Sequence, residues 1–244
     1  MKRLKNRKIL LLLPILLLVI GAMGLVLGIL FYGQDASPKM WLVSVYNSYT
    51  QFTFLFMIYV FVSTFSDDFA KGIYAFMKQV GYPLNQCIFT KAIAMYLVSF
   101  LGTNLFLIMT NIMSGNTDDP YLLMILVSVN LSLIFIILFA IVLSLLVKKT
   151  LAATLTGYGL FLLMDVLNFV GFGLTNPSDG NSISSVAIRV LAGQPLDHYS
   201  LSRMNLDFEK YGFLYATIPV LAWVLVLLLA VMFLVKKETD RNEI

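Results

Sequence analysis

The sequence is poor in the residue types and motifs on which most enzymes depend. Among its 244 residues are one histidine, one cysteine and only 12% charged side chains. No G-x-x-x-x-G-K-[ST] loop, H-E-x-x-H pair or G-x-S-x-G elbow occurs in it. These absences exclude P-loop nucleotide binding and argue against most metal-dependent and histidine-based hydrolases. We therefore expect a chain that is not an enzyme and has no metal site or cofactor of its own.

Carboxylates are equally scarce within the apolar stretches, where Asp165 is the one acidic residue deep inside a run. No pair of carboxylates stands there, which argues against an aspartyl-type membrane protease or a proton relay. An ionisable residue at that depth is a candidate functional residue by default. The alternative is a carboxyl that is protonated or hydrogen-bonded to Asn168 or another helix. Asn104 and Asn130 also lie within apolar runs, and we expect each to hydrogen-bond across helices.

The composition places the chain in a lipid bilayer. With 59% hydrophobic residues it is too apolar for a soluble domain. A helix needs roughly 20 apolar residues to span the bilayer core. The sequence predicts an all-α polytopic protein in a single transmembrane domain, with six spans at 9–31, 41–65, 92–111, 121–147, 151–175 and 212–235.

Positive charges predict the orientation of these spans. If both termini are cytoplasmic, thirteen of the 17 Lys and Arg residues face the cytoplasm: Lys2, Arg3, Lys5, Arg7, Lys8, Lys71, Lys78, Lys91, Lys148, Lys149, Lys236, Lys237 and Arg241. Basic cytoplasmic loops are typical of membrane proteins, and the inverted orientation places these thirteen on the wrong side. Orientation also explains the net charge of +4. We expect contact with membrane lipid and none with nucleic acid.

The second span is unusually aromatic. Tyr49, Phe52, Phe56 and Tyr59 are among its rings, and its first turns are half polar. One interpretation is a helix that packs on its neighbours and has an interfacial aromatic end. The other is that these four residues, together with Asp165, line a path for an amphiphilic substrate.

The longest polar stretch, 176–211, is predicted to be an outer loop. Within it, ISSVAIRVL at 183–191 has apolar residues at helical spacing and predicts an amphipathic helix along the outer membrane surface. Gly193 and Pro195 are expected to end that helix. His198 is the only histidine, and without further ligands it is interpreted as solvated.

The segment at 66–91, between the second and third spans, is predicted to lie in the cytoplasm and to contain a short helix over 68–78. Asp67 and Asp68 are expected at the helix N-terminus, where the helix dipole favours acidic residues. An apolar stripe is formed by Phe69, Ile73, Phe76 and Met77. The stripe is able to dock on a partner or on the membrane. The alternative is a solvated turn without a partner.

This segment resembles a known motif. D-F-A-K-G-I at 68–73, followed by G-Y-P-L-N-Q-C-I-F-T-K at 81–91, is similar to the segment after the second span in permeases of the type-2 ABC exporter family. The matching positions are Asp68, Phe69, Gly72, Gly81, Tyr82, Ile88 and Lys91, with Ile88 displaced by one. Two positions depart from the pattern, because Ile73 stands where Thr is usual and Leu84 where Arg is usual. The small size and the Gly-Tyr pair look most similar to Firmicute permeases for antimicrobial or cytolytic peptides, including immunity permeases.

The resemblance implies a function. In such permeases the segment is a coupling helix that sits in a groove of a separate ATPase subunit, which binds ATP and Mg. Two ATPase copies and a second permease chain, identical or homologous, complete the exporter, here in a bacterial plasma membrane. The resemblance implies an amphiphilic substrate, such as a peptide, a toxin or a lipid-like molecule. It assigns the coupling contact to Asp67, Asp68, Phe69, Gly72, Ile73, Phe76, Met77, Gly81 and Tyr82.

Two other functions stay open on the sequence. One is a non-transporting membrane immunity or scaffold protein that binds a peptide or a partner helix. The other is a membrane enzyme without a recognisable motif.

Overall fold

The computed structural model describes residues 3–33, 37–115, 119–170, 176–194 and 207–241, and within them the regular structure is entirely helical. Six helices are long: α1 (Arg3–Tyr32), α2 (Pro38–Ala70), α4 (Leu84–Met113), α5 (Asp119–Val147), α6 (Thr150–Phe169) and α9 (Phe208–Arg241). Two are short: α3 (Ile73–Gln79) lies between α2 and α4, and α7 (Ile183–Leu191) lies between α6 and α9.

All six long helices are long and apolar enough to cross a membrane. They correspond to the six predicted spans and confirm an all-α, multi-pass membrane protein. Some helices extend beyond the predicted spans by more than a turn, since α2 continues to Ala70 and α4 begins at Leu84. Helix α6, which corresponds to the predicted fifth span, ends at Phe169. The last residues of that predicted span, 171–175, lie outside the described residues.

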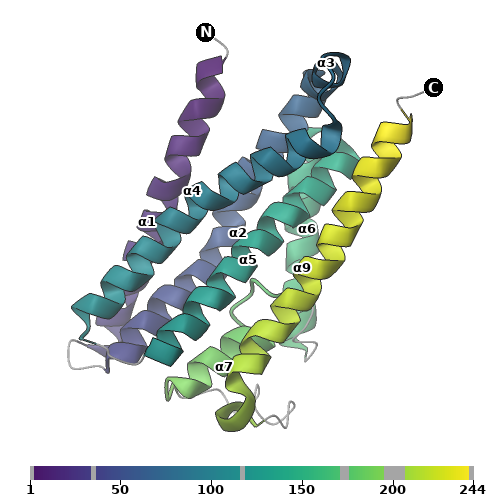
Figure 1. Cartoon of the computed structure of the whole chain (residues 1–244). Helices are drawn as coiled ribbons and strands as arrows, with labels where there is room; N and C mark the ends of the chain where they lie inside the picture. Colours follow the sequence, from purple (N-terminus) through teal and green to yellow (C-terminus); the bar gives the residue numbers. More distant parts are fainter. Residues whose placement is uncertain (1–2, 34–36, 116–118, 171–175, 195–206, 242–244) are drawn as a thin grey trace.

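The helices pack around α5, the most buried of the six. It contacts α2, α4, α6 and α9, while α1 lies outside this group against α2 and α4 (Figure 1). Phe135 of α5 is fully buried, and its ring contacts the Phe139 and Trp223 rings. The two residues between α5 and α6 form a tight turn, so these helices are the antiparallel pair that the short connection predicts.

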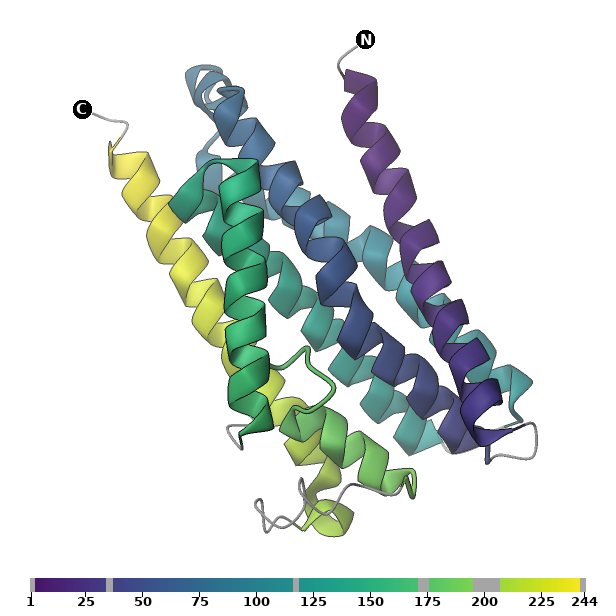
Figure 2. The ribbon, with the colours of Figure 1, turned by 180° about the vertical axis from the view of Figure 1, so that it is seen from behind.

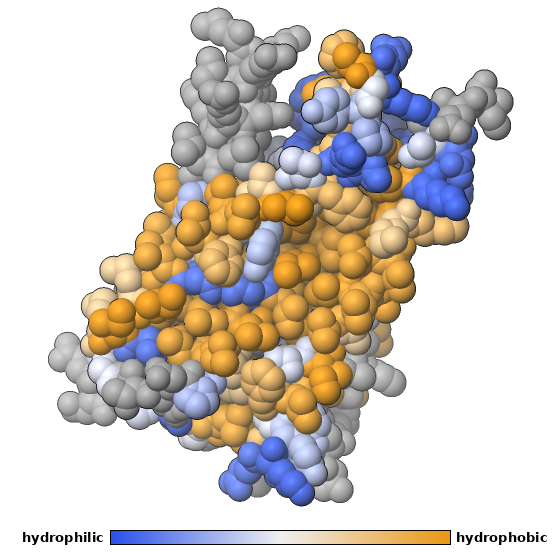
Figure 3. All heavy atoms as spheres, viewed as in Figure 1, coloured by the Kyte–Doolittle hydropathy of each residue, from blue (hydrophilic) through white to orange (hydrophobic). Residues whose placement is uncertain are grey.

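The two predicted interhelical amides pair with each other. Asn104 of α4 donates to the Asn130 side-chain oxygen at 3.1 Å, and Asn130 of α5 donates back at 2.8 Å. This reciprocal pair satisfies groups that have no water partner in hydrocarbon. A small hydrophilic area interrupts the apolar surface where α4 and α5 meet (Figure 3).

One end of the bundle carries α3 together with both termini, and α7 lies at the other end (Figure 1). Hydrophobic residues cover the middle of the face shown in Figure 3, and hydrophilic residues gather towards its two ends. This banding is expected for a protein whose middle section is surrounded by lipid. It leaves the α3 end and the α7 end as the two polar faces.

The short helix α7 has the predicted bounds but not the predicted environment. Val186, Ala187 and Ile188 are at most 2% exposed, and Ser184 and Ser185 are fully buried. The helix packs against α9 and also contacts α2 and α5, so it is part of the bundle and not a helix lying on the surface. The segment before it loops back between α6 and α2 (Figure 2). The lone histidine, His198, lies outside the described residues.

Candidate functional site

The hairpin formed by α2, α3 and α4 is the candidate site, and its helix boundaries differ from the prediction. Asp67 and Asp68 lie in the last turn of α2 and not at the start of the short helix. Acidic residues are unfavourable beside a helix C-terminus. Both carboxylates have basic partners here, which offsets that cost and lets α2 continue. The short helix begins only after Gly72, whose φ of 67° reverses the chain in a conformation that favours glycine.

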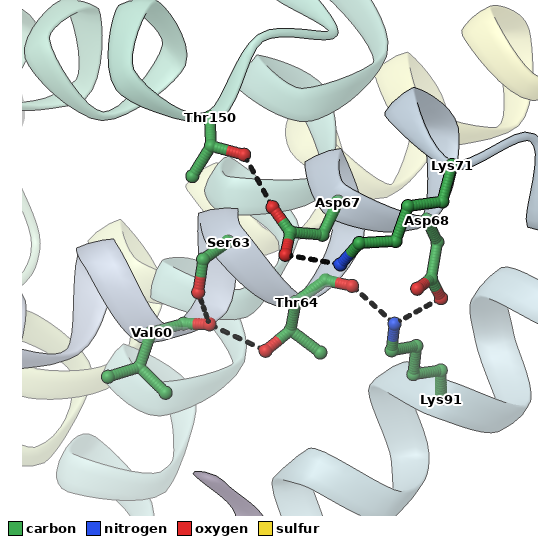
Figure 4. A network of polar contacts seen from close by, with 8 residues as sticks. All are labelled: Val60, Ser63, Thr64, Asp67, Asp68, Lys71, Lys91 and Thr150. Carbon is green, nitrogen blue, oxygen red and sulfur yellow. Dashed lines mark hydrogen bonds and ion pairs between the residues drawn. The ribbon is translucent and has the colours of Figure 1, made fainter. Parts of the chain in front are cut away.

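An ion pair between Asp68 and Lys91 closes the base of the hairpin (Figure 4). Lys91 reaches from α4, contacts the Asp68 carboxylate and also donates to the Thr64 main-chain oxygen of α2. The pair is largely shielded, since the Asp68 side chain is 10% exposed and that of Lys91 22%. The ammonium also lies over the Phe65 ring, 5.4 Å from its centroid. These contacts fix the end of α2 against the beginning of α4.

Asp67 connects the hairpin to a third helix. Its Oδ1 accepts a hydrogen bond from Thr150 Oγ1 at 2.8 Å, at the start of α6, and its Oδ2 pairs with Lys71 at 2.7 Å (Figure 4). The Asp67 and Lys71 side chains are half exposed, so that pair contributes little by itself. The bond to Thr150 ties the last turn of α2 to α6. The end of α2 is therefore held by both α4 and α6.

The helix α3 projects from this base with large apolar side chains exposed. Ile73, Phe76 and Val80 are 37%, 62% and 61% exposed, whereas Met77 is half-buried. Phe69 belongs to α2 and packs beneath α3, its ring 4.5 Å from that of Tyr74. The exposed stripe thus lacks Phe69 and gains Val80, because the short helix begins at Ile73, five residues later than predicted, and Val80 directly follows it.

Tyr74 lies on the buried side of α3, and its position in the sequence did not predict this burial. It is 7% exposed, and burial, with a smaller effect of the Asp68 charge, raises the pKa of its phenol. A neutral ring packed on Phe69 makes α3 rest on α2 through an apolar contact. One face of α3 is therefore anchored while the other is open.

A defined turn joins α3 to α4. Gly81 has φ of 83°, its N–H donates to the Lys78 oxygen, and the Tyr82 N–H donates to the Met77 oxygen. These two bonds form a Schellman motif, which requires a left-handed residue at its centre. Tyr82 is left 56% exposed beside the apolar face of α3.

The C-terminal end of α9 meets the same hairpin. A groove of about 840 Å³ is lined by Tyr74, Lys78 and Tyr82 on one side and by Lys148, Glu238 and Thr239 on the other. Glu238 pairs with Lys148, and Lys78 donates to the Thr239 oxygen at 3.4 Å. Its volume lies within the range of ligand sites. Helices α2, α3, α4 and α9 thus surround one recess at this end of the bundle.

The chain matches no protein-family model, no curated protein and no solved structure. Within the described part of the chain, no group of three His, Cys, Asp or Glu residues is placed to hold a metal ion.

The residues predicted to line a substrate path have different surroundings. Tyr49 is buried, and its hydroxyl donates to the Leu17 oxygen of α1 at 3.1 Å. Phe52 and Phe56 contact each other with ring centroids 6.3 Å apart. Phe56 and Tyr59 are 50% and 55% exposed on the outside of α2. Tyr49 therefore acts as an interhelical contact, whereas Phe56 and Tyr59 belong to the outer surface.

Asp165 has a partner that the sequence did not indicate. Its carboxyl acts electrostatically on that of Asp179, a residue of the segment predicted to be an outer loop. Burial and the neighbouring carboxyl raise the pKa of Asp179 to about 7. Asp179 lies outside the apolar runs, in the segment before α7, so the sequence did not indicate this neighbour. The predicted Asn168 contact exists, but it is made to Asp179.

Proposed function

We propose that the chain is the permease subunit of an ATP-driven exporter and that α3 is the coupling helix that docks on a separate ATPase subunit. The observation that carries this proposal is the form of α3. It is a seven-residue helix held between two membrane-spanning helices, and it presents Ile73, Phe76 and Val80 outward. Large apolar side chains on a polar end of a bundle mark a surface for a partner.

The anchoring of α3 supports a role in transmitting movement. The hairpin is fixed by Asp68 and Lys91 at its base and by Tyr74 under α3. A partner that tilts α3 acts on α2 and α4 together, and through Asp67 and Thr150 on α6. Closure of the ATPase then favours one arrangement of the spans over another.

The charge at the α3 end supports a cytoplasmic location. Lys71, Lys78, Lys148, Lys149, Lys236 and Lys237 belong to helix ends and turns gathered there. An excess of lysine marks the cytoplasmic side of a membrane protein. Both termini are then cytoplasmic, and the ATPase approaches from the side where ATP is present.

The proposed assembly contains two ATPase subunits and two permease chains in a bacterial plasma membrane. ATP and Mg bind to the ATPase subunits alone. The proposed substrate is amphiphilic, for example a peptide, because the exposed aromatic surface of α2 suits molecules that partition into the bilayer. Phe56 and Tyr59 belong to that surface.

The test is whether ATP hydrolysis co-purifies with the chain. The tagged protein is purified from membranes of its native host in a mild detergent, and hydrolysis in the eluate is measured. Phe76→Asp with Val80→Asp removes the exposed apolar face and is expected to abolish the associated hydrolysis. Gln79→Asp is the matched control, since it adds a charge at another exposed position of α3 and should retain most of the activity.

An eluate without ATP hydrolysis above that of untagged membranes contradicts the proposal. That result, with the chain still folded, favours the non-transporting immunity or scaffold protein. Equal hydrolysis in the double variant and the wild type also contradicts it, because α3 is then not the docking element.

A further inference from the structure

The groove between α3 and α9 lies where several membrane-spanning stretches end. A candidate span ends at Ala70 in α2, at Val147 in α5 and at Asp240 in α9, and another begins at Leu84 in α4. Ala70 and Leu84 line the groove, as does Lys148, the residue after Val147. Lipid headgroups lie where the apolar part of a membrane protein gives way to its polar end. The groove is therefore at the level of the headgroups.

The lining of the groove is both apolar and charged. Phe69, Pro83 and Leu84 contribute hydrocarbon surface, and Tyr82 contributes a ring that is 56% exposed. Lysine and glutamate side chains complete the lining. A ligand that has a charged part and an apolar part suits such a surface, and phospholipids at this level of the membrane have both.

Two lysines from different elements meet at the end of α9. Lys78 at the end of α3 donates to the Thr239 main-chain oxygen at 3.4 Å, and Lys148 forms an ion pair with Glu238. Because Glu238 and Thr239 are consecutive, both ammonium groups lie at the same turn of α9. The Lys148 ammonium also lies over the Phe69 ring, 5.9 Å from its centroid. Positive charge and apolar surface thus occur side by side in the groove.

These ammonium groups suit a phosphate. Each carries three N–H donors, so each can hold a phosphate oxygen in addition to its contact with α9. The Lys148 side chain is 41% exposed, which leaves its ammonium accessible. The charged residues of the lining are two lysines and one glutamate, so the lining favours an anion over a cation. Basic pockets between spans are typical of sites for anionic headgroups, whereas a choline headgroup adds a cation beside the lysines.

We propose that this groove binds one anionic phospholipid, whose phosphate is held by Lys78 and Lys148 and whose apolar part packs on Phe69 and Leu84. The groove volume of about 840 Å³ is sufficient for a headgroup with its glycerol. A lipid bound there joins α3 to the end of α9 through the two lysines. The proposal concerns the face of α3 that is turned towards α9, and it requires no ATPase.

The experiment uses the purified full-length chain in a neutral detergent. Dioleoyl phosphatidylglycerol is added in increasing amounts, and the unfolding temperature is followed by tryptophan fluorescence. A ligand of the folded state raises this temperature, and the lipid fraction that gives half of the full rise reports its affinity. Dioleoyl phosphatidylcholine is expected to have little effect. Inorganic phosphate, added alone, tests whether the phosphate group suffices without the lipid, and it is also expected to have little effect.

Paired variants locate the site. Lys78→Gln with Lys148→Gln should raise the half-saturating lipid fraction at least about tenfold, since each lysine at a lipid surface contributes a several-fold effect. Lys149→Gln with Lys236→Gln is the matched control, because it removes two exposed lysines outside the lining. It should keep the wild-type value. Glu238→Gln removes the carboxylate that competes for Lys148 and should lower the fraction.

Several results would overturn the proposal. An equal rise with phosphatidylcholine means that the groove does not select an anionic lipid, and an equal rise with inorganic phosphate means that the ligand is a free anion. An equal loss in the control pair assigns the effect to general surface charge. If the lysine pair fails to fold, an unchanged fraction in Glu238→Gln still contradicts a phosphate at Lys148. Since the assay contains no ATPase, its result is independent of the docking of α3.

Discussion

The Asp68 carboxylate at the end of α2 forms an ion pair with the Lys91 ammonium near the start of α4, across 23 residues of sequence. Between the two residues lies the whole of α3 with both of its flanking turns. The motif that resembles type-2 ABC permeases begins and ends with these two charges. Their contact gives that spacing a physical reason, since it closes the hairpin at its base.

Breaking this pair from one side should be costly. Asp68→Asn or Lys91→Met leaves an uncompensated charge in a shielded place and is expected to lower stability by roughly 3–5 kcal/mol. The double variant Asp68→Leu with Lys91→Met removes both charges and should recover most of that loss. Thermal unfolding in detergent, followed by tryptophan fluorescence, provides the comparison. If the double variant loses the sum of the single losses, the residues do not act as a pair.

The turn before α3 requires a left-handed residue. Gly72→Ala is expected to destabilise the hairpin by about 1–2 kcal/mol, because φ of 67° is strained for an L-residue with a side chain. Gly159→Ala is the matched control, since Gly159 lies in α6 with open space around it. The control should be neutral or slightly stabilising. Equal unfolding temperatures for the two alanine variants would count against a strained turn at Gly72.

Much of this fold follows from the sequence, because the length and hydrophobicity of its apolar runs predict the six long helices. The boundaries near α3 do not follow. Asp67 and Asp68 look like a helix start when only their own segment is considered, but partners on α4 and α6 make them a helix end. The sequence also does not reveal that Asp165 and Asp179 are neighbours, since polar loop residues give no sign that their backbone re-enters the bundle.

The amide pair between α4 and α5 should show mutual dependence. Asn104→Leu or Asn130→Leu leaves the other amide without its reciprocal bond, whereas the double leucine variant leaves none unpaired. A coupling energy of about 0.6–1.7 kcal/mol is expected from a double-mutant cycle of unfolding free energies. Additive losses would mean that each amide acts alone.

Stability should depend on pH through Asp179. Burial raises the pKa of its carboxyl from 3.8 to about 7. Between these values the folded chain keeps a proton that the unfolded chain has released, so stability falls as pH rises through this window and levels off above it. Unfolding temperatures at pH 5 and pH 7.5 measure the fall. In Asp179→Asn this contribution should vanish, and Asp207→Asn should retain it; a wild-type slope in Asp179→Asn contradicts the assignment.

The docking of α3 on an ATPase is tested most directly by a cross-link from its exposed face. A photoreactive amino acid replaces Phe76, and the cells are irradiated before the membranes are solubilised. The account predicts a covalent product between this chain and a P-loop ATPase, identified by mass spectrometry. Leu30, near the C-terminal end of α1, is 73% exposed and serves as the control position. It should yield no such product. Cross-links from Phe76 to lipid alone, or ATPase products equally abundant from Leu30, would contradict a coupling role for α3.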